Sequence, residues 1–326
     1  MTNLTKDNES LYRQVATRID TFLNDHEGES FDRRTVYNDC HIDTPEARHE
    51  ASRKLSYEVK QGRLEKTGKG IFRYINTIVS TIDWVNASEK ADSYIRWPYG
   101  VNDQSTFGFD GHVIVSPGDI VVIAGEGNTG KTTFCMNLLW ENMDYFPCTL
   151  MGNEYTPSRT KRRFMQMDWR DPLDEHGKPK FELILRYNNW KDIIRPNHIN
   201  IIDWINVTDN FYQIGDILEG IKSKLNKGVA ICAIQKEKGK DMGRGGSFTM
   251  DFPILYLAMG FGQLKVVKGK EYIGKNLDNS VDGFELWGKM LERFDKIRPL
   301  KKCPKCKGFQ GNNKCDICDG KGWHDA

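Results

Sequence analysis

The sequence predicts an α/β fold in which helices cover a mostly parallel sheet, with a smaller unit at each end of the chain. Three observations support this prediction. Apolar runs alternate with helical periods through the middle of the chain, three helical segments and a short hairpin precede them, and four cysteines are clustered near the C-terminus. Alternation of strands and helices is typical of parallel sheets with helices on their faces.

The composition describes a well-solvated chain with enough apolar residues for a sizeable core. Of 326 residues, 38% are hydrophobic and 28% are charged, and the formal net charge is +2. No run approaches the eighteen apolar residues that a membrane span needs, so we expect no membrane partner. The first residues lack a signal-peptide pattern, and we expect a cytoplasmic location.

The first 79 residues predict a winged helix-turn-helix. Residues 9–25 carry apolar side chains at a helical period, a second helix is expected over 31–38, and a third begins at Thr44-Pro45 and ends near Gly62. Two short strands follow, as in modules whose third helix enters the DNA major groove. Between residues 44 and 74 there are eight Lys or Arg against four Asp or Glu. The expected DNA contacts are Arg48, Arg53 and Lys54, with Lys60, Lys66 and Lys69. A protein-docking module or an oligomerisation arm is the alternative.

Residues 80–95 are expected to form a linker and residues 96–299 the α/β domain. Strands are predicted at IVVIAG, CTLMG, INIIDWI and VAICAIQ, and helices at TTFCMNLLWENM, SRTKRRFMQM and YQIGDILEGIKSKL. Later strands are expected at LYLAM, QLKVVKG and FELWG.

The strongest motif is G-x-x-x-x-G-K-[ST] between the first of these strands and its helix. Its glycines let backbone N–H groups surround phosphates, and the helix N-terminus favours negative charge. We therefore expect a nucleoside triphosphate, ATP or GTP, and Mg²⁺ here, with Lys131 on the β- and γ-phosphates and Thr132 on the metal. The expected nucleotide-binding residues are Gly125, Glu126, Gly127, Asn128, Thr129, Gly130, Lys131, Thr132 and Thr133, together with Asp203.

Three polar residues at strand ends are candidates for the rest of a hydrolytic site. Asp203 near the end of INIIDWI suits a Walker B carboxylate that acts through the magnesium shell. Glu154 after CTLMG suits a base that orients the attacking water, and Gln235 suits a γ-phosphate sensor. A capping aspartate, a surface glutamate and an ordinary strand-end glutamine are the respective alternatives.

The order of P-loop, strand-end glutamate, IIDWI and strand-end glutamine resembles the RecA-like ATPases, above all the helicase domain of DnaB-type replicative helicases and related phage or mobile-element ATPases. The resemblance covers about residues 96–298. It implies a ring or filament of identical chains with nucleotide between subunits and DNA in the centre. It also implies that Glu154 is the catalytic base and Gln235 the sensor.

Two basic segments correspond to functional segments of this family, and the first departs from the family pattern. Family helicases carry a basic finger that reaches the neighbour's nucleotide, and the matching stretch KVVKGK makes Lys268 and Lys270 the candidates, without an arginine. The loop after VAICAIQ commonly faces DNA in such proteins, and its expected contacts are Lys236, Lys238, Lys240 and Arg244. A mobile solvent loop is the alternative. The ring-assembling N-terminal domain of the family is replaced by the winged-helix-like unit.

The C-terminal cysteines predict a zinc-binding knuckle over residues 300–326. Cys303 and Cys306 form one C-x-x-C arm, and Cys315 and Cys318 form the other, as in four-thiolate Zn²⁺ sites. The two arms resemble repeats of the DnaJ-type zinc domain, which implies one zinc. A thiol redox pair is the alternative, and the tail could contact nucleic acid or protein.

Taken together, these motifs predict a magnesium-dependent ATPase that acts on DNA, a DnaB-like helicase or translocase in replication or recombination of a phage or mobile element. Replication proteins are possible partners. The alternatives are a RecA/RadA-like recombination mediator and a nucleotide-switched DNA-binding regulator.

Overall fold

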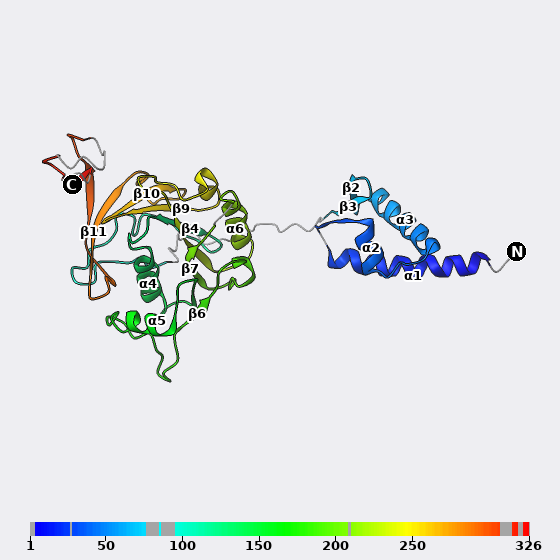
Figure 1. The fold of residues 1–326 in the computed structure, drawn as a ribbon, viewed down its shortest axis with the longest axis horizontal. Helices are drawn as coiled ribbons and strands as arrows, with labels where there is room; N and C mark the ends of the chain where they lie inside the picture. Colours follow the sequence, from blue (N-terminus) through cyan, green and yellow to red (C-terminus); the bar gives the residue numbers. More distant parts are fainter. Residues whose placement is uncertain are drawn as a thin grey trace. The chain divides into compact units, whose positions relative to one another are not determined.

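The structure is a computed structural model that describes residues 4–26, 28–75, 85, 95–207, 210–306, 315–318 and 322–325. It divides into two compact units, Met1–Ala87 and Ser88–Ala326 (Figure 1). Most of the expected linker over residues 80–95 lies outside the described residues. Every helix in the described ranges is too short or too polar to span a bilayer.

The N-terminal unit contains the three expected helices and the hairpin, plus one further strand. Its helices are α1 (Leu4–Asp25), α2 (Arg33–Asp39) and α3 (Pro45–Lys60), and its strands are β1 (Ser30–Asp32), β2 (Leu64–Gly68) and β3 (Ile71–Tyr74). The strands form an antiparallel sheet in the order β1-β3-β2. The sequence did not predict β1, because three residues are too few for a periodic signal.

Side-chain caps begin two of these helices. Thr44 Oγ1 accepts a hydrogen bond from the N–H of Ala47 at the start of α3, and Asp32 accepts one from the N–H of Thr35 at the start of α2. The apolar faces of α1, α2 and α3 bury a core that includes Ile19, Val36 and Leu55.

A network of ion pairs joins α1 and α3, and Lys54, one of the expected DNA contacts, is part of it. Lys54 Nζ lies 2.6 Å from Glu58 Oε1 and 3.0 Å from Asp20 Oδ1, and Arg63 Nη1 lies 3.1 Å from Glu58 Oε2. The Lys54 residue is 7% exposed and Glu58 is 1% exposed. The expectation that Lys54 contacts DNA is therefore wrong for this conformation, since its ammonium group neutralises a buried carboxylate.

The second unit is built on a ten-stranded sheet in the order β13-β12-β11-β10-β9-β4-β8-β7-β5-β6. Six adjacent strands are parallel: β9 (Leu255–Gly260), β4 (Ile120–Gly125), β8 (Val229–Gln235), β7 (Ile199–Ile205), β5 (Cys148–Gly152) and β6 (Phe181–Leu185). The predicted α/β class with a mostly parallel core is confirmed.

Helices cover both faces of this sheet. They are α4 (Lys131–Asn142), α5 (Pro157–Phe164) and α6 (Gln213–Lys222), with short 3-10 turns at η1 (Trp190–Asp192) and η2 (Gly246–Met250). Alternate residues of β4 enter different cores: Val121 and Ile123 join the cluster with α4, whereas Ile120 and Val122 join the cluster with α6. This two-sided burial explains why IVVIAG is a continuous apolar run.

An antiparallel extension completes the sheet with β10 (Gln263–Gly269), β11 (Val281–Trp287), β12 (Arg293–Lys302) and β13 (Trp323–Asp325). Of these, β12 and β13 were not predicted, nor was β6 at the opposite edge. Because β12 continues through Lys302 and pairs with β13, the sheet crosses the expected domain boundary at residue 300.

Candidate active site and metal centre

The phosphate-binding loop connects β4 to α4, as predicted. At Gly125 an added Cβ would lie 2.7 Å from Lys131 Cγ and 2.9 Å from Thr129 Oγ1, so only glycine fits. Gly130 has a φ of 100°, which favours glycine at the start of α4. The Thr129 hydroxyl donates to the carbonyl of Glu126 (3.0 Å) and fixes the loop from within.

Lys131 lies inside this loop. Its Nζ donates to the carbonyl oxygens of Gly125 (2.9 Å) and Glu126 (2.6 Å), and the residue is 8% exposed. Burial lowers the pKa of Lys131, and the nearby Asp203 carboxyl opposes this shift. The position suits an ammonium group that exchanges carbonyl partners for phosphate oxygens.

Asp203 lies beside the hydroxyl of Thr132. Thr132 Oγ1 donates to Asp203 Oδ1 at 3.2 Å, which brings the two residues expected around magnesium together. The Tyr155 hydroxyl donates to the other carboxylate oxygen at 2.9 Å. Burial raises the pKa of Asp203, while these two hydrogen bonds oppose the rise.

Glu154 and Gln235 line the same cavity as the P-loop. This cavity has a volume of about 440 Å³, and its walls include Gly127, Asn128, Gly130, Lys131, Thr132, Thr133, Glu154, Arg163, Trp204, Gln235, Leu286, Met290 and Leu291. Glu154 accepts a hydrogen bond from the Trp204 indole N–H (3.3 Å). Because β5, β7 and β8 are parallel, their carboxyl ends bring these side chains to one edge of the sheet.

Several residues in or beside the cavity were not predicted: Trp204 and Arg163 line it, and Tyr155 contacts Asp203. Tyr155 and Trp204 directly follow the expected carboxylates Glu154 and Asp203. This adjacency in the sequence is the one signal that could have pointed to the two aromatic residues. Arg163 of α5 donates from Nη2 to Thr133 Oγ1 (3.0 Å), and its buried Nε has no partner among the described residues. The basic run KRR gave no sign of which arginine would turn inward.

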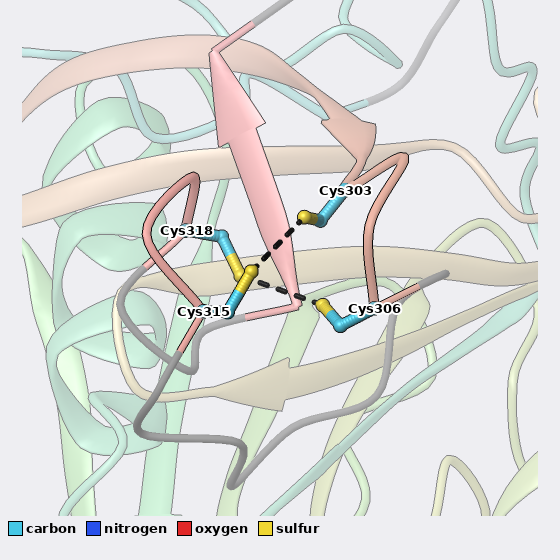
Figure 2. A group of neighbouring side chains, drawn as sticks. All are labelled: Cys303, Cys306, Cys315 and Cys318. Carbon is cyan, nitrogen blue, oxygen red and sulfur yellow. Dashed lines mark hydrogen bonds between the residues drawn. The ribbon is translucent and has the colours of Figure 1, made fainter.

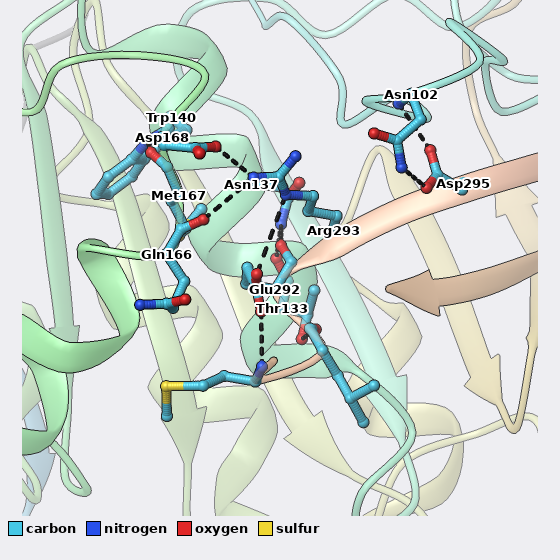
Figure 3. Close-up of polar contacts among 12 residues, drawn as sticks. Asn102, Thr133, Asn137, Trp140, Gln166, Met167, Asp168, Glu292, Arg293 and Asp295 are labelled. Atoms are coloured by element: carbon cyan, nitrogen blue, oxygen red, sulfur yellow. Dashed lines mark hydrogen bonds and ion pairs between the residues drawn. The ribbon is translucent and has the colours of Figure 1, made fainter. Parts of the chain in front are cut away.

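The tip of the β11–β12 hairpin forms the apolar wall of the cavity. Two hydrogen bonds hold the tip on α4: Thr133 Oγ1 donates to the carbonyl of Leu291 (3.0 Å), and Asn137 Nδ2 donates to the carbonyl of Glu292 (2.8 Å) (Figure 3). Arg293, the next residue, pairs with Asp168. These contacts place Met290 and Leu291 at the cavity wall.

The basic loop after β8 is attached to the P-loop. Lys236 Nζ lies 3.2 Å from Glu126 Oε1, and the N–H of Gly239 donates to the same oxygen (3.2 Å). Lys236 is 7% exposed, so its expected role as a DNA contact is corrected to a link with Glu126. Lys238, Lys240 and Arg244 are exposed and stay predictions.

Lys268 and Lys270 lie away from the P-loop of their own chain. β10 runs antiparallel to β9, so its last residues lie beside Leu255, at the sheet edge opposite the phosphate loop. Lys268 Nζ donates to the carbonyl of Met250, and Lys270 Nζ to that of Asp251 (3.3 Å). Any action on nucleotide would therefore be on a neighbouring chain, and the finger role stays a prediction.

Two of the expected DNA contacts in the N-terminal unit are exposed and stacked on tyrosine rings. The Arg48 guanidinium lies 5.5 Å from the ring centre of Tyr37, and that of Arg53 lies 5.2 Å from that of Tyr12. Arg53 also pairs with Glu50 (2.8 Å). Their contact with DNA stays a prediction.

The four C-terminal cysteines converge on one point (Figure 2). Their sulfur atoms all lie within 4.8 Å of one another, and the Cys303–Cys315 and Cys306–Cys318 pairs are 3.5 Å and 3.4 Å apart. Tetrahedral zinc with Zn–S bonds of about 2.3 Å separates its sulfurs by roughly 3.8 Å. Backbone N–H groups of Cys306 and Lys305 lower the pKa of the Cys303 thiol to about 6. The donor set fits zinc.

The strand order now classifies the core. The P-loop strand β4 lies between β8 and β9, and β8 separates it from β7, which carries Asp203. The core is therefore a mostly parallel α/β fold in which the phosphate-binding loop follows an interior strand of the sheet. No protein-family model and no curated protein sequence matches this chain. Among solved structures, the KaiC-like protein PH0186 from Pyrococcus horikoshii OT3 is similar, with 16% identity and a TM-score of 0.45; the match covers 63% of this chain and 100% of that one.

Proposed function

We propose that this protein is a magnesium-dependent ATPase that acts on DNA. The observation that carries the ATPase part is the contact between Thr132 and the buried Asp203 (3.2 Å), since Thr132 lines a cavity together with Lys131, Glu154 and Gln235. A P-loop alone binds nucleotide, whereas hydrolysis also needs a metal-side carboxylate and a group that orients water.

Each residue has a role that follows from its position. Lys131 and the N–H groups at the start of α4 would bind the phosphates, and Thr132 and Asp203 would hold Mg²⁺ directly or through water. When bound, Mg²⁺ neutralises charge on the phosphate oxygens. Glu154 would accept a proton from the attacking water, and Gln235 would donate a hydrogen bond toward the γ-phosphate.

The apolar wall suits the nucleobase. Leu286, Met290 and Leu291 form the side of the cavity contributed by the β11–β12 hairpin, and Leu286 Cδ1 lies 3.2 Å from the position of a Cβ on Gly130. A planar base gains apolar contact from such side chains.

The DNA part of the proposal rests on the exposed basic groups. Lys238, Lys240 and Arg244 follow the sensor strand on a glycine-rich loop, which suits phosphate contacts without base readout. A DnaB-like helicase or translocase that assembles as a ring or filament is the preferred form. A recombination mediator and a nucleotide-switched regulator that reads DNA through the N-terminal unit are the alternatives.

The test is ATP hydrolysis with and without single-stranded DNA. Lys131→Ala should abolish nucleotide binding and turnover, and Glu154→Gln should keep binding while turnover falls at least about 100-fold. Glu175→Gln and Lys178→Ala change exposed side chains on the 171–180 loop and serve as matched controls.

The outcomes separate the proposals. Full turnover in Glu154→Gln would contradict the role of Glu154 while leaving the ATPase intact. Strand displacement with polarity on a forked duplex supports the helicase over the mediator. Slow turnover that is insensitive to single strands, with a sequence-specific footprint on duplex DNA, would favour the regulator.

A further inference from the structure

Two dipeptides meet at the candidate hydrolytic site, and each consists of a carboxylate followed by an aromatic hydrogen-bond donor. Glu154-Tyr155 follows β5, and Asp203-Trp204 lies near the end of β7. The strands are neighbours in the sheet, with Gly152 opposite Asp203. At Gly152 an added Cβ would lie 2.0 Å from the carbonyl oxygen of Asp203, so glycine permits this close approach.

The hydrogen bonds cross between the dipeptides. The Tyr155 hydroxyl donates to Asp203 Oδ2 (2.9 Å), and the Trp204 indole N–H donates to Glu154 Oε1 (3.3 Å). Each carboxylate is therefore held by the aromatic residue that follows the other carboxylate. Both rings pack against the main hydrophobic core, which limits their rotation and fixes the donors.

We propose that Tyr155 and Trp204 are positioning residues that form a reciprocal clamp, in which Tyr155 orients the metal-side Asp203 and Trp204 orients the water-activating Glu154. This inference rests on the proposed ATPase function and adds two residues to it. An isolated glutamate on an exposed strand end samples many rotamers, and a hydrogen bond from a packed indole reduces them before substrate binds. Preorganisation of this kind favours a transition state over a ground state.

The clamp predicts that each aromatic residue affects the carboxylate it contacts and not the carboxylate that precedes it in the sequence. Tyr155→Phe keeps the ring and removes the donor, and it should raise the Mg²⁺ concentration for half-maximal turnover roughly fivefold, with kcat at saturating Mg²⁺ unchanged. Trp204→Phe should lower kcat roughly fivefold to tenfold, with nucleotide affinity and half-saturating Mg²⁺ unchanged. These factors correspond to the loss of one hydrogen bond.

The experiment measures steady-state ATP hydrolysis over a Mg²⁺ titration, fluorescent-nucleotide affinity and thermal unfolding for the wild type and both variants. Tyr187→Phe and Trp287→Phe alter exposed rings outside the cavity and should match the wild type. If Trp204→Phe does not fold, the clamp is tested with Tyr155→Phe and with Trp204→His, which retains a ring N–H.

Two results would overturn the inference. One is the opposite pattern, in which Tyr155→Phe lowers kcat and Trp204→Phe raises the Mg²⁺ concentration for half-maximal turnover. Each ring would then act only on the carboxylate that precedes it in the sequence. The other is a wild-type rate in both variants. Absence of turnover in the wild type would instead contradict the proposed ATPase function, so the two failures are distinguishable.

Discussion

At the residue scale, Asp203 illustrates a conflict between stability and function. It is 4% exposed, and burial raises the pKa of its carboxyl above the ordinary value even though Tyr155 and Thr132 donate to it. The positive charges of Arg163 and Lys131 also oppose the rise in pKa, but burial outweighs them, so the ionised carboxylate remains costly. The site therefore holds a charge whose full benefit comes only with metal and nucleotide.

This conflict predicts that Asp203→Asn stabilises the metal-free protein. Because the folded chain holds the Asp203 proton more tightly than the unfolded chain, wild-type stability falls as the pH rises from the ordinary Asp pKa through the raised one. The variant should lack this fall in stability. Its free energy of unfolding at pH 7 should exceed that of the wild type by about 1 kcal/mol, which corresponds to a rise in Tm of roughly 2–4 °C.

Thermal unfolding in a chelator across pH 4–8 measures both effects. Asp216→Asn, which alters an exposed carboxylate on α6, is the control and should leave the pH slope unchanged. A variant less stable than the wild type at every pH would show that the Asp203 carboxylate stabilises the fold without metal.

At the element scale, the β11–β12 hairpin shapes the nucleotide cavity through its anchor on α4. Asn137 is 2% exposed, and its Nδ2 donates to the carbonyl of Thr133 (2.8 Å) as well as to that of Glu292 (2.8 Å). The hairpin tip thus depends on a buried amide one turn beyond the P-loop.

Asn137→Ala should loosen the tip. Loss of the amide leaves the Glu292 carbonyl without its donor, which costs about 1–3 kcal/mol of stability. The KM for ATP should rise several-fold because Met290 and Leu291 are less well held. Asn188→Ala, on an exposed loop, is the matched control. Reduced stability with an unchanged KM would exclude the tip from the nucleotide site.

The elements themselves show which parts of the site could be predicted from sequence. Asp203 and Gln235 lie at the ends of buried strands, and Glu154 and Lys131 come after such strands, so a continuous apolar run located each site. The hairpin tip, Arg163 and the Lys236–Glu126 link depend on tertiary contacts between distant segments, for which no local period exists. Lys54 was misassigned because a lysine on an exposed helix face and one in a buried ion network look alike in sequence.

At the scale of the whole molecule, the C-terminal segment that carries the four cysteines is joined to the main sheet. The backbone N–H of Cys303 donates to the carbonyl of Gly322 (2.9 Å), and β13 pairs with the last residues of β12. Arg298 Nε also lies 2.6 Å from Asp325 Oδ1. The tail is therefore attached to the main sheet by strand pairing as well as by covalent connection.

We expect one zinc ion per chain, bound by all four cysteines. Cys315→Ser should reduce the zinc content several-fold because a thiolate ligand is lost. Metal analysis of the purified protein measures this, and Cys232→Ser, at a buried cysteine outside the cluster, is the control. Full zinc content in Cys315→Ser would contradict the four-ligand site.

The pairing of β13 with β12 has a consequence for solubility. The outer edge of β12 is covered in two parts: the segment 100–105 bonds to Phe294, Asp295, Lys296 and Ile297, and β13 covers Leu300 to Lys302. An uncovered edge strand is a template for pairing with another chain. We therefore expect that removal of the tail would expose a short stretch of free backbone donors and acceptors at Leu300 to Lys302 and would make the protein more prone to aggregation.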